Sequence, residues 1–372
     1  MGNKKEYNLP VCDADATIIM KQGTSRPFGV CFLLAAAMLS ACSPQAPQAT
    51  SSIAESTENA EIPTSEPTQE LPTTAEPTAL SSGDVRVSEI DDMEQIYIAE
   101  GDFIMGADDD EAKDTACRVN GVACAENPVS TVYVPAFWMD KYEVTNYQYS
   151  LCTAAGFCQA PKLGRGTYTG NPIDDQFFDY YDNPKYANHP MVYVDFYMAR
   201  DYCAWAGRRL PTEREWEKAA RGTDGRKYPW GNDAIGDDRG NFCDGNCPKD
   251  HANNNYDDGY AQTAPVGSYP AGASAYGVMD MAGNVWEWVN TIPMDYPYNP
   301  EDGREEPDTR PGSCYPPDSC AADETPFGAG PERIWRGGTW ANGPWWIRAT
   351  VRYHSVPGYY HNSLGFRCAA DE

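Results

Sequence analysis

Short apolar runs separated by glycine and other turn residues characterise much of this chain. Residues 95–98 and 102–105 flank Gly101, and residues 131–134 and 136–139 follow with similar length and composition. Runs of this length that are rich in branched and aromatic side chains are typical of β-strands. We therefore predict four short strands in this part of the chain.

Helices are predicted from residues that favour the helix ends. Thr and Asp side chains accept hydrogen bonds from the free amides of a first helical turn, and Gln or Glu three residues later completes a capping box. Glycine just after the last turn ends a helix. The predicted caps are Thr145 with Gln148, Asp195 for a helix through Trp205 that ends at Gly207, and Thr212 with Glu215 for a helix to about Ala220 that ends at Gly222.

The composition indicates a folded domain with much irregular structure. Aromatic residues make up 12% of the 372 residues, which is ample for a core, while 32 Gly and 30 Pro indicate short elements and long loops. The formal net charge is -27. Nucleic acid and anionic lipid head groups are therefore not expected as partners, because like charges repel.

The first 42 residues are predicted to be an export signal. Residues 28–41 form an apolar run of signal-peptide length after Lys21 and Arg26, too short for a comfortable transmembrane helix. The run ends in Leu-Ser-Ala-Cys, which resembles the bacterial lipobox, and this predicts lipidation at Cys42. Met20 is an alternative start, and an ordinary secretory signal is the alternative interpretation.

Residues 43–83 are predicted to be a disordered tether. They consist mainly of Pro, Thr, Ser, Ala and Glu. Such a segment cannot bury enough apolar surface to offset the entropy lost on ordering. The folded domain is then residues 84–372. We expect an exported protein that is lipid-anchored to a bacterial membrane, with its domain facing outside.

Ten of the 13 cysteines follow the anchor, and an even number in an exported domain indicates disulfides. Four pairs are close in sequence, and Cys203 and Cys368 remain. The last close pair could instead be redox-active, but its Pro and Asp neighbours do not favour a reactive thiolate. The close pairs are Cys117 with Cys124, Cys152 with Cys158, Cys243 with Cys247, and Cys314 with Cys320.

Four motifs together resemble the formylglycine-generating enzyme family, also called sulfatase-modifying factors. They are RLPTEREW at residues 209–216, YGVMDMAGNVWEW at 276–288, RIWRGGTW at 333–340 and LGFRCA at 364–369. The resemblance covers about residues 95–371. It implies a single α+β domain, distantly C-type-lectin-like, with short strands, few helices and much irregular structure. It also implies a long-range disulfide between Cys203 and Cys368.

This chain lacks the residues that carry out the family's oxidation chemistry. The segment RATVR at residues 348–352 belongs to the same resemblance. In that family a cysteine pair shortly before its second arginine binds copper(I) and oxidises a substrate cysteine. Counting back without gaps from the Gly-Phe-Arg-Cys sequence at 365–368, Pro344 and Ala349 occupy the two positions. Neither can be a thiolate. We therefore expect no copper and no catalytic residue.

Two structural calcium sites are implied by the same resemblance. Calcium prefers six to eight oxygen ligands from carboxylates, side-chain amides and carbonyls. The second site departs from the family pattern because two cysteines are inserted into its loop, and for both sites the alternative is that Asp and Asn only form turns. The first site comprises the side chains of Asp280 and Glu287 and the carbonyls of Gly283 and Val285; the second comprises the side chains of Asn241 and Asp258 and the carbonyls of Phe242 and Tyr260.

The segment between Trp340 and Leu364 corresponds to the substrate-binding face of the family and is dense in aromatic residues. Tyr and Trp supply large contact area at small entropic cost, as in antibody paratopes. The predicted ligand-binding residues are Trp345, Trp346, Tyr353, His354, Tyr359, Tyr360 and His361.

Other aromatic residues are expected in the core. Trp286, Trp288, Trp335 and Trp340 belong to the fixed motifs and are predicted to be buried. Tyr353, Tyr359 and Tyr360 lie among Gly, Ser, Pro and His without a period of two, so we predict a surface loop for them.

These features favour a cell-surface lipoprotein whose domain binds an extracellular protein, peptide or glycan without catalysis. His354 and His361 alone do not form a catalytic site. The C-terminal frame also resembles the variable proteins of diversity-generating retroelements, which display a hypervariable patch on this fold. The alternative function is a formylglycine-generating oxidase that acts on a cysteine of a sulfatase-like substrate.

Overall fold

The computed structural model describes residues 79–108, 118–119, 122–123, 126–161, 180–310, 313–314, 325–326 and 330–372. All described residues belong to one compact unit within Thr74–Glu372. The predicted signal peptide, Cys42 and most of the tether therefore lie outside the described residues.

The first sheet joins the two ends of the domain. Its strand order is β1 (Val85–Val87), β2 (Glu94–Ile98), β7 (Phe137–Asp140) and β14 (Ala369–Asp371), and each neighbouring pair is antiparallel. A separate antiparallel pair consists of β3 (Gly101–Met105) and β6 (Ser130–Val134). These strands confirm the four that the apolar runs predicted.

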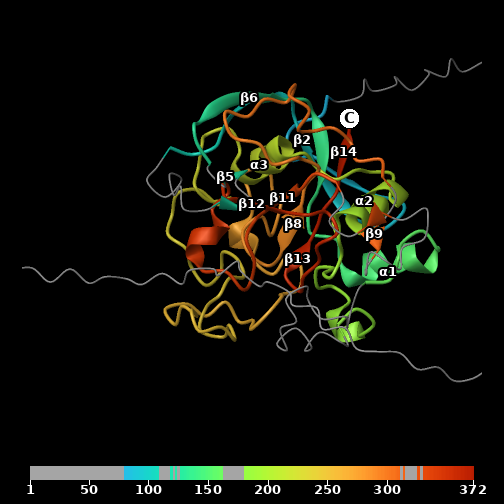
Figure 1. The fold of residues 1–372 in the computed structure, drawn as a ribbon. Coiled ribbons are helices and arrows are strands. Elements are labelled where there is room, and N and C mark those ends of the chain that lie inside the picture. Colours follow the sequence, from blue (N-terminus) through green and yellow to red (C-terminus); the bar gives the residue numbers. More distant parts are fainter. Residues whose placement is uncertain are drawn as a thin grey trace, which may run out of the picture. The chain divides into compact units, whose positions relative to one another are not determined.

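The second sheet contains the strands of the C-terminal motifs. Its order is β12 (Arg352–Ser355), β11 (Arg333–Arg336), β8 (Trp286–Trp288) and β13 (Leu364–Gly365), with β13 parallel to β8 and the other pairs antiparallel. Three motifs that are distant in sequence are thus side by side in one sheet (Figure 1). Four two-residue strands are described by their backbone only: β4 (Arg118–Val119), β5 (Val122–Ala123), β9 (Ser313–Cys314) and β10 (Thr325–Pro326).

Three α-helices are present among the described residues, and all three confirm the predicted caps. They are α1 (Asn146–Ala154), α2 (Phe196–Trp205) and α3 (Glu213–Arg221), and capping boxes open α1 and α3. Helix α3 packs against β3, β6 and β11 (Figure 1). Short 3-10 turns occur at η2 (Pro184–Tyr186), η3 (Pro270–Gly272) and η5 (Pro344–Ile347). Few helices and short strands give the predicted α+β fold.

None of these helices, which are those of the described residues, is apolar over a length that could cross a membrane. The buried sides of the helices pack with the tryptophans of the motifs in the core. The four tryptophans that the sequence placed in the core are all buried, and three of them pack with α2 in the same cluster. They are Trp286, Trp288, Trp335 and Trp340.

Three of the predicted disulfides are present. Cys203 and Cys368 join α2 to the residue before β14 across a sequence separation of 165 residues. The other two close short loops, between Cys152 and Cys158 and between Cys243 and Cys247. The side chains of Cys117, Cys124, Cys314 and Cys320 lie outside the described residues, so their pairing stays a prediction.

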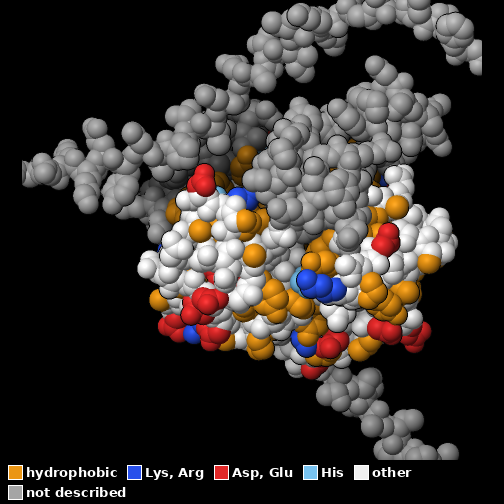
Figure 2. Space-filling view, turned by 90° about the horizontal axis from the view of Figure 1, so that it is seen from below, with side chains coloured by type: hydrophobic (Ala, Val, Ile, Leu, Met, Phe, Trp, Pro, Cys, Tyr) orange, Lys and Arg blue, Asp and Glu red, His pale blue; other side chains and the backbone are white. Residues whose placement is uncertain are grey.

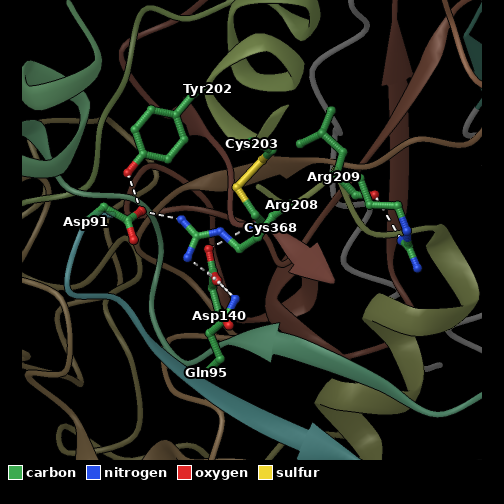
Figure 3. Close-up of a disulfide and its surroundings, with 9 residues drawn as sticks. Asp91, Gln95, Asp140, Tyr202, Cys203, Arg208, Arg209 and Cys368 are labelled. Carbon is green, nitrogen blue, oxygen red and sulfur yellow. Dashed lines mark hydrogen bonds and ion pairs between the residues drawn. A yellow bond between two sulfur atoms is a disulfide. The ribbon is translucent and has the colours of Figure 1, made fainter. Parts of the chain in front are cut away.

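A buried charge network surrounds the long-range disulfide (Figure 3). Arg208 forms ion pairs with both Asp91 and Asp140, and all three side chains are almost fully buried. Asp140 also accepts a hydrogen bond from the backbone amide of Cys368 at 2.9 Å. Burial raises the pKa of Asp140 to about 6, although the Arg208 charge opposes this shift.

This pKa predicts that Asp140 makes the protein less stable as the pH rises. A carboxyl with a higher pKa in the folded than in the unfolded state contributes fully below its ordinary pKa of 3.8 and loses that contribution as the pH rises through about 6. The loss amounts to about 3 kcal/mol over that range. Urea unfolding of the Asp140→Asn variant at pH 4, 5, 6 and 7.5 in chelator should therefore give a flatter pH profile than the wild type.

The matched control is Asp224→Asn. Asp224 is exposed, and its hydrogen bonds to Arg226 lower its pKa, so this variant lacks a group that titrates in the same range. Its profile between pH 5 and 7.5 should follow the wild type. A profile of Asp140→Asn that is as steep as the wild type would contradict the prediction.

Candidate functional site

Five of the predicted ligand-binding residues form a half-exposed surface, which we name the aromatic face: Trp345, Trp346, Tyr353, Tyr359 and His361. Trp345 and Trp346 lie in η5. Pro344 occupies the first position of this turn, where the fixed φ of proline is favourable. Tyr353 lies in β12, opposite Trp335 of β11. The 3-10 turn and the strand pairing thus bring these rings together.

The aromatic face rests on two buried tryptophans. The ring centroids of Tyr353 and Tyr359 lie 5.3 and 5.1 Å from that of Trp335. Trp346 stands edge-on to Trp286 at 6.3 Å. Tilted and edge-to-face contacts at these distances stabilise aromatic clusters beyond simple burial. The half-exposed rings therefore have a rigid base.

Two predicted ligand-binding residues are not accessible, which corrects the sequence interpretation. His354 is 3% exposed, and its Nδ1 lies 2.8 Å from a carboxylate oxygen of Glu332. Tyr360 is 5% exposed and packs in a cluster with Trp340. The predicted surface loop is wrong for Tyr360, and for Tyr353 because that residue lies in a strand. Alternation along β12 turns His354 inward beside its half-exposed neighbour.

Two buried arginines, Arg348 and Arg352, support the face from within. Arg352 donates two hydrogen bonds to Glu213, at 2.9 and 2.8 Å. Arg348 forms a similar bidentate pair with Glu126, at 2.8 and 2.7 Å, and its guanidinium lies 4.7 Å from the ring centroid of Trp345. Buried pairs of this kind orient their neighbours. Arg348 therefore holds Trp345 in place.

The two positions that match the family's copper ligands are structural here. Pro344 begins η5, while Ala349 is completely buried and donates its amide to the carbonyl of Lys227 at 2.9 Å. All cysteines with described side chains are in disulfides. Within that part of the chain, no free thiol approaches the face.

A cavity of about 460 Å³ has Arg348 in its wall. Its walls include Arg221, Lys227 and Thr350, and they include none of the predicted ligand-binding residues. The guanidinium groups in its wall already bond to Glu126 and Glu217. The cavity is therefore separate from the aromatic face.

The first predicted calcium site lies in a turn of unusual backbone conformation. Asp280 and Gly283 have φ values of 58° and 90°. Burial raises the pKa of the Asp280 carboxyl to about 6, and the nearby Glu287 charge adds to the shift. Glu287 is engaged by Arg367, which donates to both of its carboxylate oxygens, at 2.7 and 2.8 Å. A cation here would share Glu287 with that arginine.

Sequence reasoning missed a third acid beside this turn, Glu143. Its side chain is completely buried, and its Oε1 has no hydrogen-bond partner. Burial and the Asp280 charge raise the pKa of Glu143 well above its ordinary value. The sequence carries no direct signal for it, because Glu143 lies far from Asp280 along the chain and the fold alone brings them together.

The second predicted site adjoins the first. Asp258 accepts the amides of Phe242 and Tyr260 at 2.9 and 3.0 Å, and burial, with Asp244 and Asp257 nearby, raises its pKa to about 7. The Oδ1 of Asn241 is buried without a partner. Because Asn241 also donates its Nδ2 to Asn284, 3.1 Å away, the two turns interlock.

The residues present fit calcium better than a transition metal. Within the described ranges, no three His, Cys, Asp or Glu side chains are arranged to hold a metal ion by themselves. Oε1 of Glu143 and Oδ1 of Asn241 nevertheless lack partners in the protein, and buried polar atoms normally have one. Oxygen ligands supplemented by carbonyls and water suit a hard cation.

Comparison with known proteins agrees with this geometry. The family described as "Sulfatase-modifying factor enzyme 1-like domain" matches residues 82–372. The chain is 32% identical over 309 residues to a formylglycine-generating enzyme of Thermomonospora curvata, covering 74% of this chain and 93% of that protein. It is 32% identical over 296 residues to hercynine oxygenase of Mycobacterium tuberculosis, covering 72% of this chain but only 59% of that protein. A mouse protein named inactive C-alpha-formylglycine-generating enzyme 2 is 29% identical over 325 residues, covering 78% and 90%.

Solved structures share the fold. PvdO from Pseudomonas aeruginosa superposes with a TM-score of 0.55 at 24% identity, covering 79% of this chain and all of that one. Treponema denticola variable protein 1 superposes with a TM-score of 0.50 at 18% identity, covering 78% and 99%. These likenesses confirm the architecture that the sequence predicted.

Proposed function

Since this chain belongs to the family of sulfatase-modifying factor enzyme 1-like domains, we propose that it uses the family's fold as a non-catalytic ligand-binding module at a bacterial cell surface. The aromatic face is the observation that supports this function. Half-exposed rings on a rigid buried base give a ligand a large contact area at small entropic cost. Its ligand is an extracellular protein, peptide or glycan.

The chemistry around the face supports binding over catalysis. His361 contacts Ser363 two residues away, at 2.7 Å, and His354 is buried against Glu332. Catalysis needs a placed nucleophile, base or redox metal, and Pro344 and Ala349 provide no thiolate. The inactive mouse relative supports the view that this family includes members without catalysis.

A binding screen with the full chain against cell-surface proteins, peptides and glycans tests this function. Replacing Trp345 or Tyr359 by Ala should weaken binding about tenfold or more, because aromatic anchors carry much of the energy of an interface. Tyr147→Ala is the matched control, since Tyr147 is 52% exposed on α1 and outside the face. An affinity that is unchanged in both Trp345→Ala and Tyr359→Ala would contradict the proposal.

A formylglycine-generating oxidase is the second candidate. The similarity to the Thermomonospora curvata enzyme over 93% of that protein's length favours it. Copper(I) titration and oxygen uptake with a cysteine-containing peptide separate the two functions. Turnover by the purified protein would replace the binding function with this one.

A more specific form of the binding function is a variable protein of a diversity-generating retroelement. The fold shared with Treponema denticola variable protein 1 is compatible with this form, because such a fold can carry a changeable patch. A reverse transcriptase and a template repeat near the gene would support it. A gene neighbourhood without both would rule it out.

Export and lipid anchoring at Cys42 complete the proposal. The apolar run before Leu39-Ser-Ala-Cys42 and the Pro- and Thr-rich segment after it support a membrane anchor followed by a spacer. Metabolic labelling with a radioactive fatty acid should mark the peptide that contains Cys42. An unlabelled peptide would remove the anchor from the proposal.

Calcium is proposed as the structural ion of the two interlocked turns. Chelation should lower the melting temperature, because an ion that binds only the folded state at 100 times its Kd adds about 2.7 kcal/mol. Asp258→Asn and Asp280→Asn should each reduce the response to calcium in differential scanning calorimetry. Asp250→Asn is the control, since Asp250 is exposed in the same loop. An identical melt of the wild type with and without chelator would count against both sites.

A further inference from the structure

The loop of residues 243–253 contacts the segment that leads into the aromatic face. A disulfide between Cys243 and Cys247 closes its first turn. The amide of Cys243 donates to the carbonyl of Asn342 at 2.8 Å. Nε2 of His251 lies 3.0 Å from the carbonyl oxygen of Ala341. The loop is thus fixed to the residues that lead directly into η5 and Trp345.

Three polar side chains lie at this junction: those of His251, Asn342 and Lys249. A carbonyl only accepts, so Nε2 of His251 is the donor in this hydrogen bond, and in that tautomer Nδ1 is an acceptor. The Oδ1 of Asn342 is buried and has no partner. Lys249 Nζ lies 5.7 Å from the ring centroid of Trp340. The junction therefore offers two acceptors and one donor.

The charge of the protein restricts the ligand further. Acids exceed bases by 27 in the chain, and Figure 2 shows acidic side chains gathered toward the edges of one face of the domain. This field repels anionic ligands. A suitable ligand is therefore neutral, has an apolar surface for the aromatic rings, and carries groups that both donate and accept hydrogen bonds.

We propose that the aromatic face and loop 243–253 together bind a neutral saccharide. The rings of Trp345 and Trp346 contact the apolar side of a sugar, while its hydroxyls donate to Asn342 Oδ1 and His251 Nδ1 and accept from Lys249. Hydroxyl groups fit such a junction because each is both donor and acceptor. This inference rests on the proposed binding function and names its ligand class.

Full-length protein on an array of neutral oligosaccharides, with uronic-acid and sulfated counterparts, tests the ligand class. We expect binding to neutral members only. By calorimetry with the best neutral oligosaccharide, His251→Ala and Asn342→Ala should each lower affinity about tenfold, because sites built to bond a hydroxyl discriminate strongly against its loss. Asn255→Ala should stay within about twofold of the wild type, because this residue is exposed in the next turn of the chain, outside the junction.

The variants are designed to preserve the fold. The backbone of Asn342 donates to Thr339 and accepts from Cys243, and its side chain can be truncated without removing either bond. A monodeoxy oligosaccharide that lacks the recognised hydroxyl should also bind the wild type about tenfold more weakly, and Asn342→Ala should lower its affinity no further. That non-additivity is a result that loss of structure would not produce.

The possible outcomes separate this inference from the proposed function. A protein or peptide ligand that needs Trp345 and Tyr359 while no neutral saccharide binds would overturn the ligand class and leave the binding function standing. A saccharide affinity that is unchanged in both His251→Ala and Asn342→Ala would also overturn the inference. Binding that is unaffected by Trp345→Ala and Tyr359→Ala would overturn the proposed function itself.

Discussion

Replacing Cys203 and Cys368 together by Ser should lower the free energy of unfolding by about 5 kcal/mol in the chain-entropy account of disulfide stability. The bond spans a sequence separation of 165 residues and joins α2 to the end of the domain. Without it, the unfolded chain gains the conformations that this long closed loop excludes. Urea unfolding under oxidising conditions measures the difference.

The short disulfide between Cys152 and Cys158 provides the control. Its sequence separation is 6 residues, and the same reasoning gives about 2 kcal/mol for its removal. The structure adds a further loss for the long bond, because the amide of Cys368 donates to buried Asp140. Equal losses for the two double variants, or a larger loss for the short bond, would contradict the chain-entropy explanation here.

The parts of the fold that could be predicted from the sequence are those with local causes. The side chains of Thr145 and Thr212 each accept a hydrogen bond from the amide of the residue three positions later, and the side chain of that residue bonds in turn to the threonine amide. Four consecutive residues therefore contain the complete signal for a helix start. Gly222 ends α3 with a φ of 66°, which glycine adopts without strain. The strands around Gly101 follow from the same kind of local pattern.

The order of strands in the sheets depends on contacts between distant residues. Nothing in the sequence near Leu364 shows that it pairs in parallel with Trp286, and only the resemblance to a family indicated the bond between Cys203 and Cys368. Burial within β12 shows the same limit. His354 and Tyr353 are neighbours in a polar and aromatic segment, but the pairing with β11 turns one inward and leaves the other half-exposed.

The candidate site was predicted in part for the same reason. A dense aromatic composition identified Trp345, Trp346 and Tyr359, because ring-rich surface segments need no distant partner to be recognised. The contact of His251 with the start of this segment depends on a loop about 90 residues earlier in the chain. Glu143 was missed because its place in the candidate cation site depends on its proximity to Asp280, and only the fold brings the two residues together.

Replacing Arg367 by Met should lower the free energy of unfolding by about 3–5 kcal/mol, the loss typical of breaking a buried ion pair from one side. Arg367 is completely buried and donates to both carboxylate oxygens of Glu287, at 2.7 and 2.8 Å. Its charge also opposes the rise in the pKa of Glu143 and of Asp280. Without the guanidinium, three buried acids share one region with no cation.

Calcium should offset part of this loss, which distinguishes an electrostatic cause from simple loss of packing. Urea unfolding of Arg367→Met with and without calcium measures the effect, and the difference from the wild type should be smaller when calcium is present. Arg226→Met is the control: Arg226 pairs with the exposed Asp224, so its loss should be less than about 1 kcal/mol. If calcium leaves the deficit of Arg367→Met unchanged, the three carboxylates do not share a cation site with Arg367. A deficit as small as that of the control would mean that the buried pair does not hold this part of the domain together.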